Sequence, residues 1–461
     1  MTLVLQALPL VVLVVLLASG RATAVQACLT ALALTLPALG LTTGSRFPAA
    51  LAAETVRAAW LAAPAMAIVA GGLLFHAAVA QPDAAPGDAP DPGDRMFTAA
   101  FLLGPFAESA TGFGVGSIFA IAAVQRAGAR GPVAASIGLL ALSLVPWGGL
   151  GPGSALGAAL AEVPVRAMLA RNAVQAGAFL LCLLPVFWGW AGLAGAPVAG
   201  RRRAVQALWV LAVAGLIMLW SRFLPWELAS LLATGPLLLL KLWLTAPPRG
   251  RLAWRRALGG IAPYALLVGS ILGARLWTAP AWRPYAELPA FPLNHVAVAL
   301  WAAACVLLAL SPARRGAARA ALARARRPAL AILLFVALAR WLGAADVPAA
   351  LAGALADAFG PLAPYASPLL AVISGFVAGS NVGSNSMLMP MQATLGRMAG
   401  LSPTLLPAVQ NFAGAAATMY APQQVSAYGS LTGARPGAIW RLAWPVYAIA
   451  VAIGAASVAL G

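Results

Sequence analysis

Charged side chains are scarce in this chain of 461 residues: only 9% are Asp, Glu, Lys or Arg, whereas 62% are hydrophobic. Ordinary soluble domains carry roughly 25% charged residues. The mean hydropathy is +0.90, and no polar stretch is long enough to fold as a separate soluble domain. The scarcity of charge therefore excludes a soluble protein and predicts a single transmembrane unit over residues 1–461.

Residues that usually build catalytic and metal sites are also few, with three cysteines, two histidines and eleven acidic residues. Cys28, Cys182 and Cys305 stand alone in apolar runs, which predicts small buried side chains rather than a metal or redox site. The sequence has no nucleophile–base pair, metal-ligand cluster or nucleotide-binding loop. We therefore expect no cofactor, no metal and no enzymatic activity, and ATP is not expected to drive the protein directly.

The net charge of +18 does not indicate a nucleic-acid partner, because no folded soluble domain could present a basic face. The arginines concentrate instead in short segments between apolar runs: Arg201–Arg203, Arg249–Arg256 and the run Arg314 to Arg327. Arginine and lysine in short loops mark the cytoplasmic side of a membrane protein. The charge therefore predicts orientation in a lipid bilayer.

Apolar runs recur along the whole chain, and most are long enough to cross a hydrocarbon core of roughly 30 Å. They lie at residues 2–19, 23–42, 58–80, 97–124, 132–150, 171–193, 205–223, 227–246, 258–277, 293–311, 329–345, 364–390, 402–420 and 438–460. Two approximate halves, 1–195 and 258–461, are joined by the runs within 205–246. Residues 81–95 are rich in Pro, Gly and Asp, which predicts an exposed linker.

One apolar run is interrupted by a carboxylate and several glycines, in the sequence Glu108-Ser-Ala-Thr-Gly-Phe-Gly-Val-Gly-Ser117. A bilayer core tolerates a lone charge or unpaired backbone only where protein or water surrounds it. Glycines let a ligand approach the main chain closely, and a helix that restarts after the break favours an anion at its N-terminus. Glycine-mediated helix packing is the structural alternative, but packing does not require Glu108. The segment therefore favours a functional site.

A second interrupted run, Gly379-Ser-Asn-Val-Gly-Ser-Asn-Ser386, lies in the last quarter of the chain. Each interrupted run is followed, roughly 30 to 35 residues later, by another segment that cannot continue as a regular helix. These later segments are Val145-Pro-Trp-Gly-Gly-Leu-Gly-Pro-Gly-Ser154 and Asn411 to Gln424. Interrupted segments at corresponding places in two halves are typical of a transporter binding site.

The number of crossings between the two interrupted runs distinguishes two topologies. If residues 97–124 and 364–398 each cross the membrane, the halves are parallel. If each is a re-entrant hairpin, about seven crossings separate them and the halves are inverted. Hairpins place Arg435 and Arg441 in the cytoplasm but Arg46 and Arg57 outside, a mild departure from the positive-inside rule. We favour an all-α polytopic membrane protein with about twelve transmembrane helices plus two re-entrant or broken hairpins in an inverted repeat.

These motifs resemble those of the bacterial L-lactate permease family. Glu108-Ser-Ala-Thr-Gly-Phe-Gly is similar to that family's Glu-Gly-Ala-Ala-Gly-Phe-Gly signature, and the segments that begin at Gly379 and Asn411 resemble its late motifs. The family usually has Pro where this chain has Gly116 and an acid where it has Asn381, and a lysine near the Pro-Gln pair is absent here. The sequence therefore resembles a divergent member of the family.

The resemblance implies a permease for lactate, glycolate or a related 2-hydroxy monocarboxylate, with proton symport, in the cytoplasmic (inner) membrane of a bacterium. The alternatives are transport of another carboxylate or sugar acid by the same architecture, and an ion channel. Charge-poor broken helices in two unequal halves favour a carrier over a symmetric pore. The expected partners are a small organic anion, a proton as coupling ion and the lipid bilayer, and the sequence is compatible with a homo-oligomer.

We assign candidate roles to the polar residues of the two interrupted runs. Glu108 is the expected proton-coupling group, because burial favours the neutral form of a carboxyl and a neutral Glu108 would not repel an incoming anion. Arg340 lies about 11 residues past the basic run, where a buried guanidinium would clamp a carboxylate; snorkelling to the membrane surface is the alternative. The expected substrate-binding residues are Thr111, Gly112, Gly114, Ser117, Ser380, Asn381, Ser384, Asn385, Asn411, Gln423 and Arg340.

Overall fold

The computed structural model describes residues 3–79, 91–112 and 114–461, and it is helical apart from one ladder of two short strands. The first helices are α1 (Leu3–Ala18), α2 (Ala24–Thr43), α3 (Phe47–Ala78), α4 (Pro92–Thr98), α5 (Gly104–Thr111), α6 (Val115–Arg126), α7 (Gly131–Leu139), α8 (Pro152–Ala161) and α9 (Val165–Leu193). The middle elements are α10 (Gly200–Phe223), α11 (Ala229–Thr245), α12 (Gly250–Arg275), β1 (Ala281–Trp282), β2 (Phe291–Pro292) and α13 (Val296–Leu310). The last helices are α14 (Arg315–Ala344), α15 (Val347–Phe359), α16 (Ser367–Ala378), α17 (Asn381–Met398), α18 (Leu405–Thr418), α19 (Pro422–Thr432) and α20 (Pro436–Ala459).

Eight helical stretches of the described residues are long and apolar enough to cross a membrane, and four shorter apolar helices accompany them. The predicted all-α class with several membrane spans is therefore confirmed. The number of twelve crossings and the inversion of the two halves stay predictions. One order of elements does occur twice along the chain, namely a helical hairpin, an interrupted helix and a long helix: α5 to α9 in the first half and α16 to α20 in the second.

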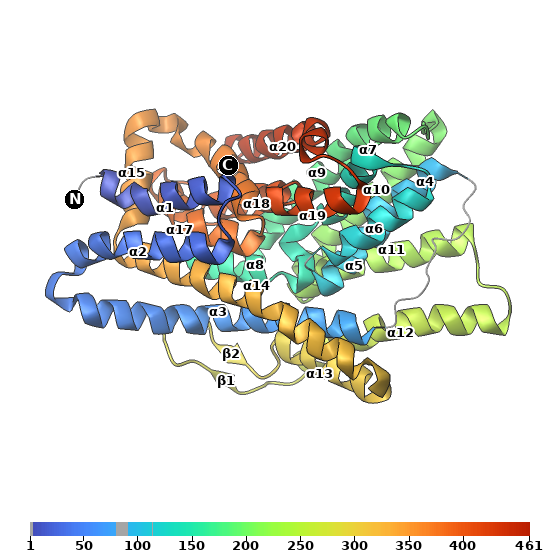
Figure 1. Cartoon of the computed structure of the whole chain (residues 1–461), viewed down its shortest axis with the longest axis horizontal. Helices are drawn as coiled ribbons and strands as arrows, with labels where there is room; N and C mark the ends of the chain where they lie inside the picture. Colours follow the sequence, from blue (N-terminus) through green and yellow to red (C-terminus); the bar gives the residue numbers. More distant parts are fainter. Residues whose placement is uncertain (1–2, 80–90, 113) are drawn as a thin grey trace.

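Most helices run roughly along the long axis of the molecule (Figure 1). α1, α2 and α15 lie toward one end of this axis, whereas α4, α11 and the start of α12 lie toward the other (Figure 1). The long helices α3 and α14 pack against each other, and β1 and β2 lie beside α3 (Figure 1). α5, α8, α18 and α19 occupy the middle of the view (Figure 1).

The basic segments are helical rather than loops, which corrects the sequence-based expectation. Arg201–Arg203 lie in the first turn of α10, and Arg251, Arg255 and Arg256 lie in the first turns of α12. The run from Arg315 to Arg327 forms the first half of α14. Its alternation of alanine and arginine explains the difference, because both residue types have high helix propensity and let the helix continue beyond its apolar part.

The predicted linker 81–95 is only partly described, since residues 81–90 lie outside the described part of the chain. Residues 92–98 form α4, so the linker ends earlier than the composition predicts. The Asp91 carboxylate accepts a hydrogen bond from the Gly93 N–H at 2.7 Å and caps α4. Asp94 pairs with Lys241 of α11 at 2.8 Å. These two acidic residues anchor the start of the first hairpin.

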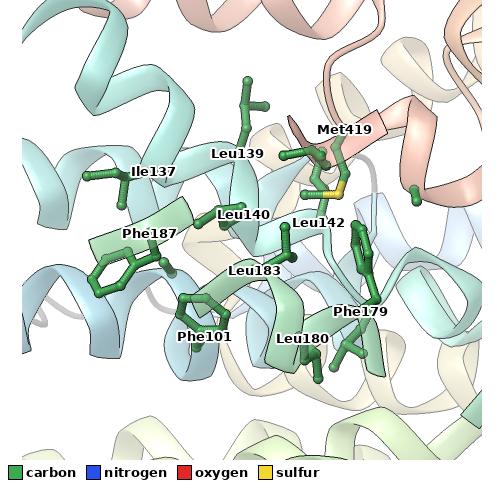
Figure 2. Packing of buried hydrophobic residues seen from close by; sticks show 14 of the residues in the cluster. Phe101, Ile137, Leu139, Leu140, Leu142, Phe179, Leu180, Leu183, Phe187 and Met419 are labelled. Carbon is green, nitrogen blue, oxygen red and sulfur yellow. The ribbon is translucent and has the colours of Figure 1, made fainter. Parts of the chain in front are cut away.

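A widened helical turn, Ala99–Leu103, joins α4 to α5, so residues 92–111 form one continuous helical arm. Pro105 explains the widening, because its ring nitrogen cannot donate to a carbonyl of the preceding turn. Phe101 in this turn packs against Phe187 of α9 with ring centroids 5.5 Å apart. Figure 2 shows Phe101 and Phe187 near Leu140 and Leu183, with Met419 and Phe179 in the same cluster. This core holds the helical arm of residues 92–111 beside α7 and α18, the two helices that are interrupted after Leu139 and Thr418.

The cysteines depart in part from expectation. Cys28 is buried, as predicted, but Cys182 and Cys305 lie on exposed helix faces. Because α13 and the part of α9 around Cys182 are apolar on all sides, exposure in this molecule does not require a polar side chain.

Candidate functional site

The first interrupted run forms a helical hairpin, in which α5 and α6 pack against each other around a short turn. Gly112 and Gly114 in the turn have φ of 69° and 77°, a region that glycine enters without steric cost. With 12 residues, α6 is about 18 Å long at 1.5 Å per residue, which is shorter than a bilayer core. We call the residues Thr111, Gly112 and Gly114 the first tip.

Glu108 caps this hairpin from inside. Its two carboxylate oxygens accept hydrogen bonds from the N–H groups of Gly114 at 3.1 Å and Gly116 at 3.0 Å. These N–H groups open α6, so the carboxylate lies at the positive end of that helix. A side chain on Gly116 would stand 2.2 Å from the Gly104 carbonyl oxygen, and this contact excludes the proline that the resembling family usually carries there.

The second interrupted run forms a hairpin from α16 and α17, joined by Gly379 and Ser380. Gly379 adopts φ of 64°, and the Ser380 hydroxyl accepts a hydrogen bond from the Gly383 N–H at 3.1 Å, which caps α17. Gly379 and Ser380 form the second tip. The first tip is buried, whereas Ser380 is exposed at the surface. The two tips thus differ in how exposed they are at the surface of the molecule.

Each hairpin is followed by an interrupted helix. In the first half, residues 140–151 separate α7 from α8, and Gly149, Leu150 and Gly151 all have positive φ. In the second half, residues 419–421 separate α18 from α19, and Pro422 opens α19. We call residues 145–151 the first break and residues 419–421 the second break. Both restart as helices of at least ten residues.

The first break lies between the two tips. A side-chain carbon placed on Gly112 would stand 3.0 Å from the Gly149 Cα atom, so the first tip touches the break directly. A carbon on Gly153, two residues after the break, would stand 2.9 Å from the Asn381 side chain beside the second tip. The glycines permit this close approach of backbone segments.

The start of α19 also reaches both tips. Gln423 contacts Gly379 of the second tip and donates a hydrogen bond to the Val377 carbonyl oxygen at 3.4 Å. Tyr428, one turn further on, donates its hydroxyl proton to the Gly114 carbonyl oxygen at 2.8 Å. The two tips and the two breaks therefore form one contiguous region, which we call the tip region.

Four helix N-termini, those of α6, α8, α17 and α19, meet in the tip region. The first N–H groups of a helix have no partner within it, and the helix dipole adds partial positive charge. Glu108 offsets this charge at α6 only. The electrostatics of the region therefore suit a small anion that is bound by neutral donors and backbone N–H groups.

A network of uncharged side chains joins the halves beside the tips, with Asn411 of α18 at its centre. The Asn411 amide oxygen accepts from Asn381 at 3.0 Å and Asn385 at 2.8 Å, and its amide nitrogen donates to Ser154 at 2.9 Å and Asn172 at 2.6 Å. All five side chains are buried. The network fixes α8, α9, α17 and α18 relative to one another.

The structure thus brings together most of the residues that the sequence predicts. Thr111, Gly112 and Gly114 form the first tip, Ser380 belongs to the second, and Asn381 and Gln423 lie beside it. Ser384 lies deeper, where its hydroxyl bonds Ser374 at 2.8 Å. The remaining members are buried in α6, α17 and α18, namely Ser117, Asn385 and Asn411.

Arg340 has a different environment. Its guanidinium Nε atom donates to the Glu54 carboxylate of α3 at 2.7 Å, and Arg57 binds the other oxygen of the same carboxylate at 2.6 Å. An arginine already held by a carboxylate gains less from a second anion. We therefore leave Arg340 out of the proposed site and assign it to the contact between α3 and α14.

Four residues of the region lie outside the predicted set: Ser154, Asn172, Gln410 and Tyr428. Ser154 ends the Gly/Pro-rich motif of the first break, and Gln410 precedes Asn411, so both had a local sequence signal. Asn172 and Tyr428 had none, because each lies inside a regular helix, α9 or α19, and only its contacts reveal it.

Two sequence comparisons agree with the predicted resemblance. A sequence model of a family described as L-lactate permease matches residues 294–440. A curated L-lactate permease of Halalkalibacterium halodurans is 31% identical over 99 residues, which cover 22% of this chain and 19% of that relative. The aligned part thus spans about a fifth of the relative's length. The crystal structure of the Alcanivorax borkumensis YdaH transporter, described as having an unusual topology, aligns over 90% of this chain and 88% of that chain with a TM-score of 0.45 and 15% identity.

Proposed function

We propose, from the confirmed resemblance to the L-lactate permease family, that this chain is a secondary transporter for a small organic anion. The proposed substrate is lactate or a related 2-hydroxy monocarboxylate, and the proposed driving force is proton symport. The proposed location is the inner membrane of a bacterium, as a multi-pass protein. Transport requires no chemical change of the substrate, so the proposal includes no catalytic residue.

The observation that carries this proposal is the meeting of four helix N-termini in the tip region. A monocarboxylate spreads one negative charge over two oxygens, and these oxygens need donors to replace their hydration shell. Backbone N–H groups of α17 and α19 and the side chains of Ser380, Asn381 and Gln423 are the proposed donors. No fixed positive side chain is required, because several helix ends share the stabilisation of the charge.

Glu108 is the proposed proton-binding group, since it is buried and lies beside the first tip. As a carboxylate it occupies the positive end of α6 and repels an anion nearby. When a proton binds, the negative charge disappears and the N-terminus of α6 again favours an anion. Proton and substrate therefore bind cooperatively, which is the thermodynamic requirement for symport.

Purified protein in proteoliposomes tests this function. We expect labelled lactate or glycolate to accumulate inside vesicles when the outside is made acidic, and to accumulate less when only a sodium gradient is imposed. Uptake that never raises the internal substrate concentration above the external one would instead indicate a channel. The absence of uptake of lactate, glycolate and acetate would contradict the monocarboxylate proposal.

A further inference from the structure

Three carboxylates are buried within the described part of the chain: Glu54, Glu108 and Glu227. Glu54 is bound by Arg57 and Arg340, and Glu108 caps α6. Glu227, which precedes α11 in the short turn Trp226–Leu228, has no role in the site described above. A buried carboxylate is costly to keep unless it is paired or functional.

The pairing of Glu227 is incomplete. One oxygen accepts a hydrogen bond from the Arg275 guanidinium of α12 at 2.6 Å, but the other, Oε2, is buried without a partner among the described residues. The Glu227 side chain is 3% exposed, whereas the Arg275 side chain is 39% exposed. A purely structural buried ion pair is normally held by hydrogen bonds to both oxygens. Glu227 thus has a free acceptor and a partner that reaches the surface.

The turn that carries Glu227 lies beside the first break, and the Glu108 side chain faces the same segment from α5. A side-chain carbon on Gly151 would stand 2.7 Å from the ring of Trp226, the neighbour of Glu227. A carbon on Gly148 would stand 3.9 Å from the Glu108 Oε1 atom. Three residues of chain span at most about 11 Å, so Glu108 and the turn that carries Glu227 border the same short segment.

Two buried hydroxyls that follow these carboxylates in sequence join α5 and α11. Ser109, which follows Glu108 in α5, has its Oγ atom 2.6 Å from the Oγ atom of Ser230 in α11. Ser230 comes one turn after Glu227 and is fully buried. Ser109 also donates to the Pro105 carbonyl oxygen at 2.6 Å, which leaves Ser230 to donate to Ser109. A pair of hydroxyls in contact can pass a proton by exchange of their hydrogen bonds.

We infer that Glu227 is a proton-relay residue that supplies Glu108. Glu227 takes a proton at Oε2 from water that reaches the exposed side of Arg275. The O–H bond on Glu227 then breaks, and one forms on the Glu108 carboxylate, with the proton carried by the hydroxyls of Ser230 and Ser109 and by water. Glu227 is left as the anion that Arg275 stabilises, ready for the next proton. This inference rests on the proposed proton symport.

Few other charged groups face Glu227 from the elements packed around it. Arg275 approaches from α12 and bonds Glu227 directly, and Arg166 of α9 binds the carbonyl oxygens of Arg222 and Leu224 in the chain just before Glu227. Glu108, at the other end of the route, faces the uncharged hydroxyl of Tyr428 from α19. Arg275 therefore stabilises the anion that remains on Glu227 after each transfer.

A comparison of net uptake with exchange distinguishes a relay role of Glu227 from a purely structural role. Exchange of internal unlabelled for external labelled lactate needs no net proton transfer, whereas accumulation under an imposed pH gradient does. We expect Glu227→Gln to lower gradient-driven uptake roughly tenfold or more and to leave exchange close to the wild-type rate. We expect the matched control Glu54→Gln, which changes a buried carboxylate away from the route, to alter both rates in parallel.

A double variant keeps the test decisive if Glu227→Gln folds poorly because Arg275 is left unpaired. Glu227→Gln/Arg275→Gln removes both charges, so a structural role predicts that gradient-driven uptake returns with folding. The relay predicts that exchange returns while gradient-driven uptake does not. Normal gradient-driven uptake in either variant would overturn the relay alone. Wild-type uptake that ignores the pH gradient would overturn the proposed symport and the relay together.

Discussion

Glu108→Gln is expected to abolish accumulation of lactate under a pH gradient while exchange continues. Glutamine has nearly the same shape, but it carries no charge and cannot release a proton. Its amide oxygen can accept from the N–H of Gly114 or Gly116, whereas its NH₂ group faces the N–H of the other. The variant therefore imitates the protonated state and removes the link between proton and substrate binding.

The expected loss is at least roughly a hundredfold in gradient-driven uptake, the lower range for removal of a proton-transfer group. Exchange in the same vesicles is expected to become independent of pH between pH 6 and 8, about one unit either side of neutrality. Glu162→Gln is the matched control, because Glu162 is an exposed glutamate at the end of α8. Gradient-driven uptake by Glu108→Gln at the wild-type rate would remove Glu108 from the mechanism.

Asn411→Ala is expected to destabilise the transporter more than other single substitutions in the tip region. The amide of Asn411 is the partner of Asn381 and Asn172, and its removal leaves a buried donor and a buried acceptor without their hydrogen bonds. Each such group costs about 1–3 kcal/mol, and the lost side-chain volume adds to that cost. The sum is a large share of the roughly 5–15 kcal/mol that stabilises a typical protein.

Thermal denaturation in detergent measures this effect, and uptake per folded molecule should fall as well because Asn381 loses its support. Asn294→Ala is the matched control: Asn294 lies in the segment before α13 and makes one hydrogen bond, to the Trp277 carbonyl oxygen. A melting temperature for Asn411→Ala equal to that of the control would contradict the assignment of Asn411 as the centre of the network.

The sequence predicted the tip region better than the elements around it. Glu108, the tip glycines and the Ser/Asn cluster that begins at Ser380 stand out because polar residues and glycines are exceptional in apolar runs. Their chemistry is local, so the motif and its place in a hairpin could be recognised together. Contacts across the fold could not be recognised in this way. Asn172 meets Asn411 across 239 residues of sequence, and neither run indicates its partner.

Arg340 illustrates the opposite case. A charged residue in an apolar run is unusual, but its sequence context offers no means of choosing between a substrate and Glu54 as its partner. The choice depends on the packing of α14 against α3. The helical first half of α14 was missed for a related reason, because hydropathy marks where a helix is apolar and does not mark where it begins.

The central claim is that a small carboxylate binds where the two tips meet, and protection of one cysteine tests it most directly. In a background without the three native cysteines, Ser380→Cys places a thiol at the exposed second tip, and Ser430→Cys places one on the exposed side of α19 as the control. We predict that saturating lactate or glycolate slows the reaction of a maleimide with Ser380→Cys and leaves Ser430→Cys unchanged. Labelling of Ser380→Cys at the same rate with and without substrate, in protein that transports it, would contradict the proposed site.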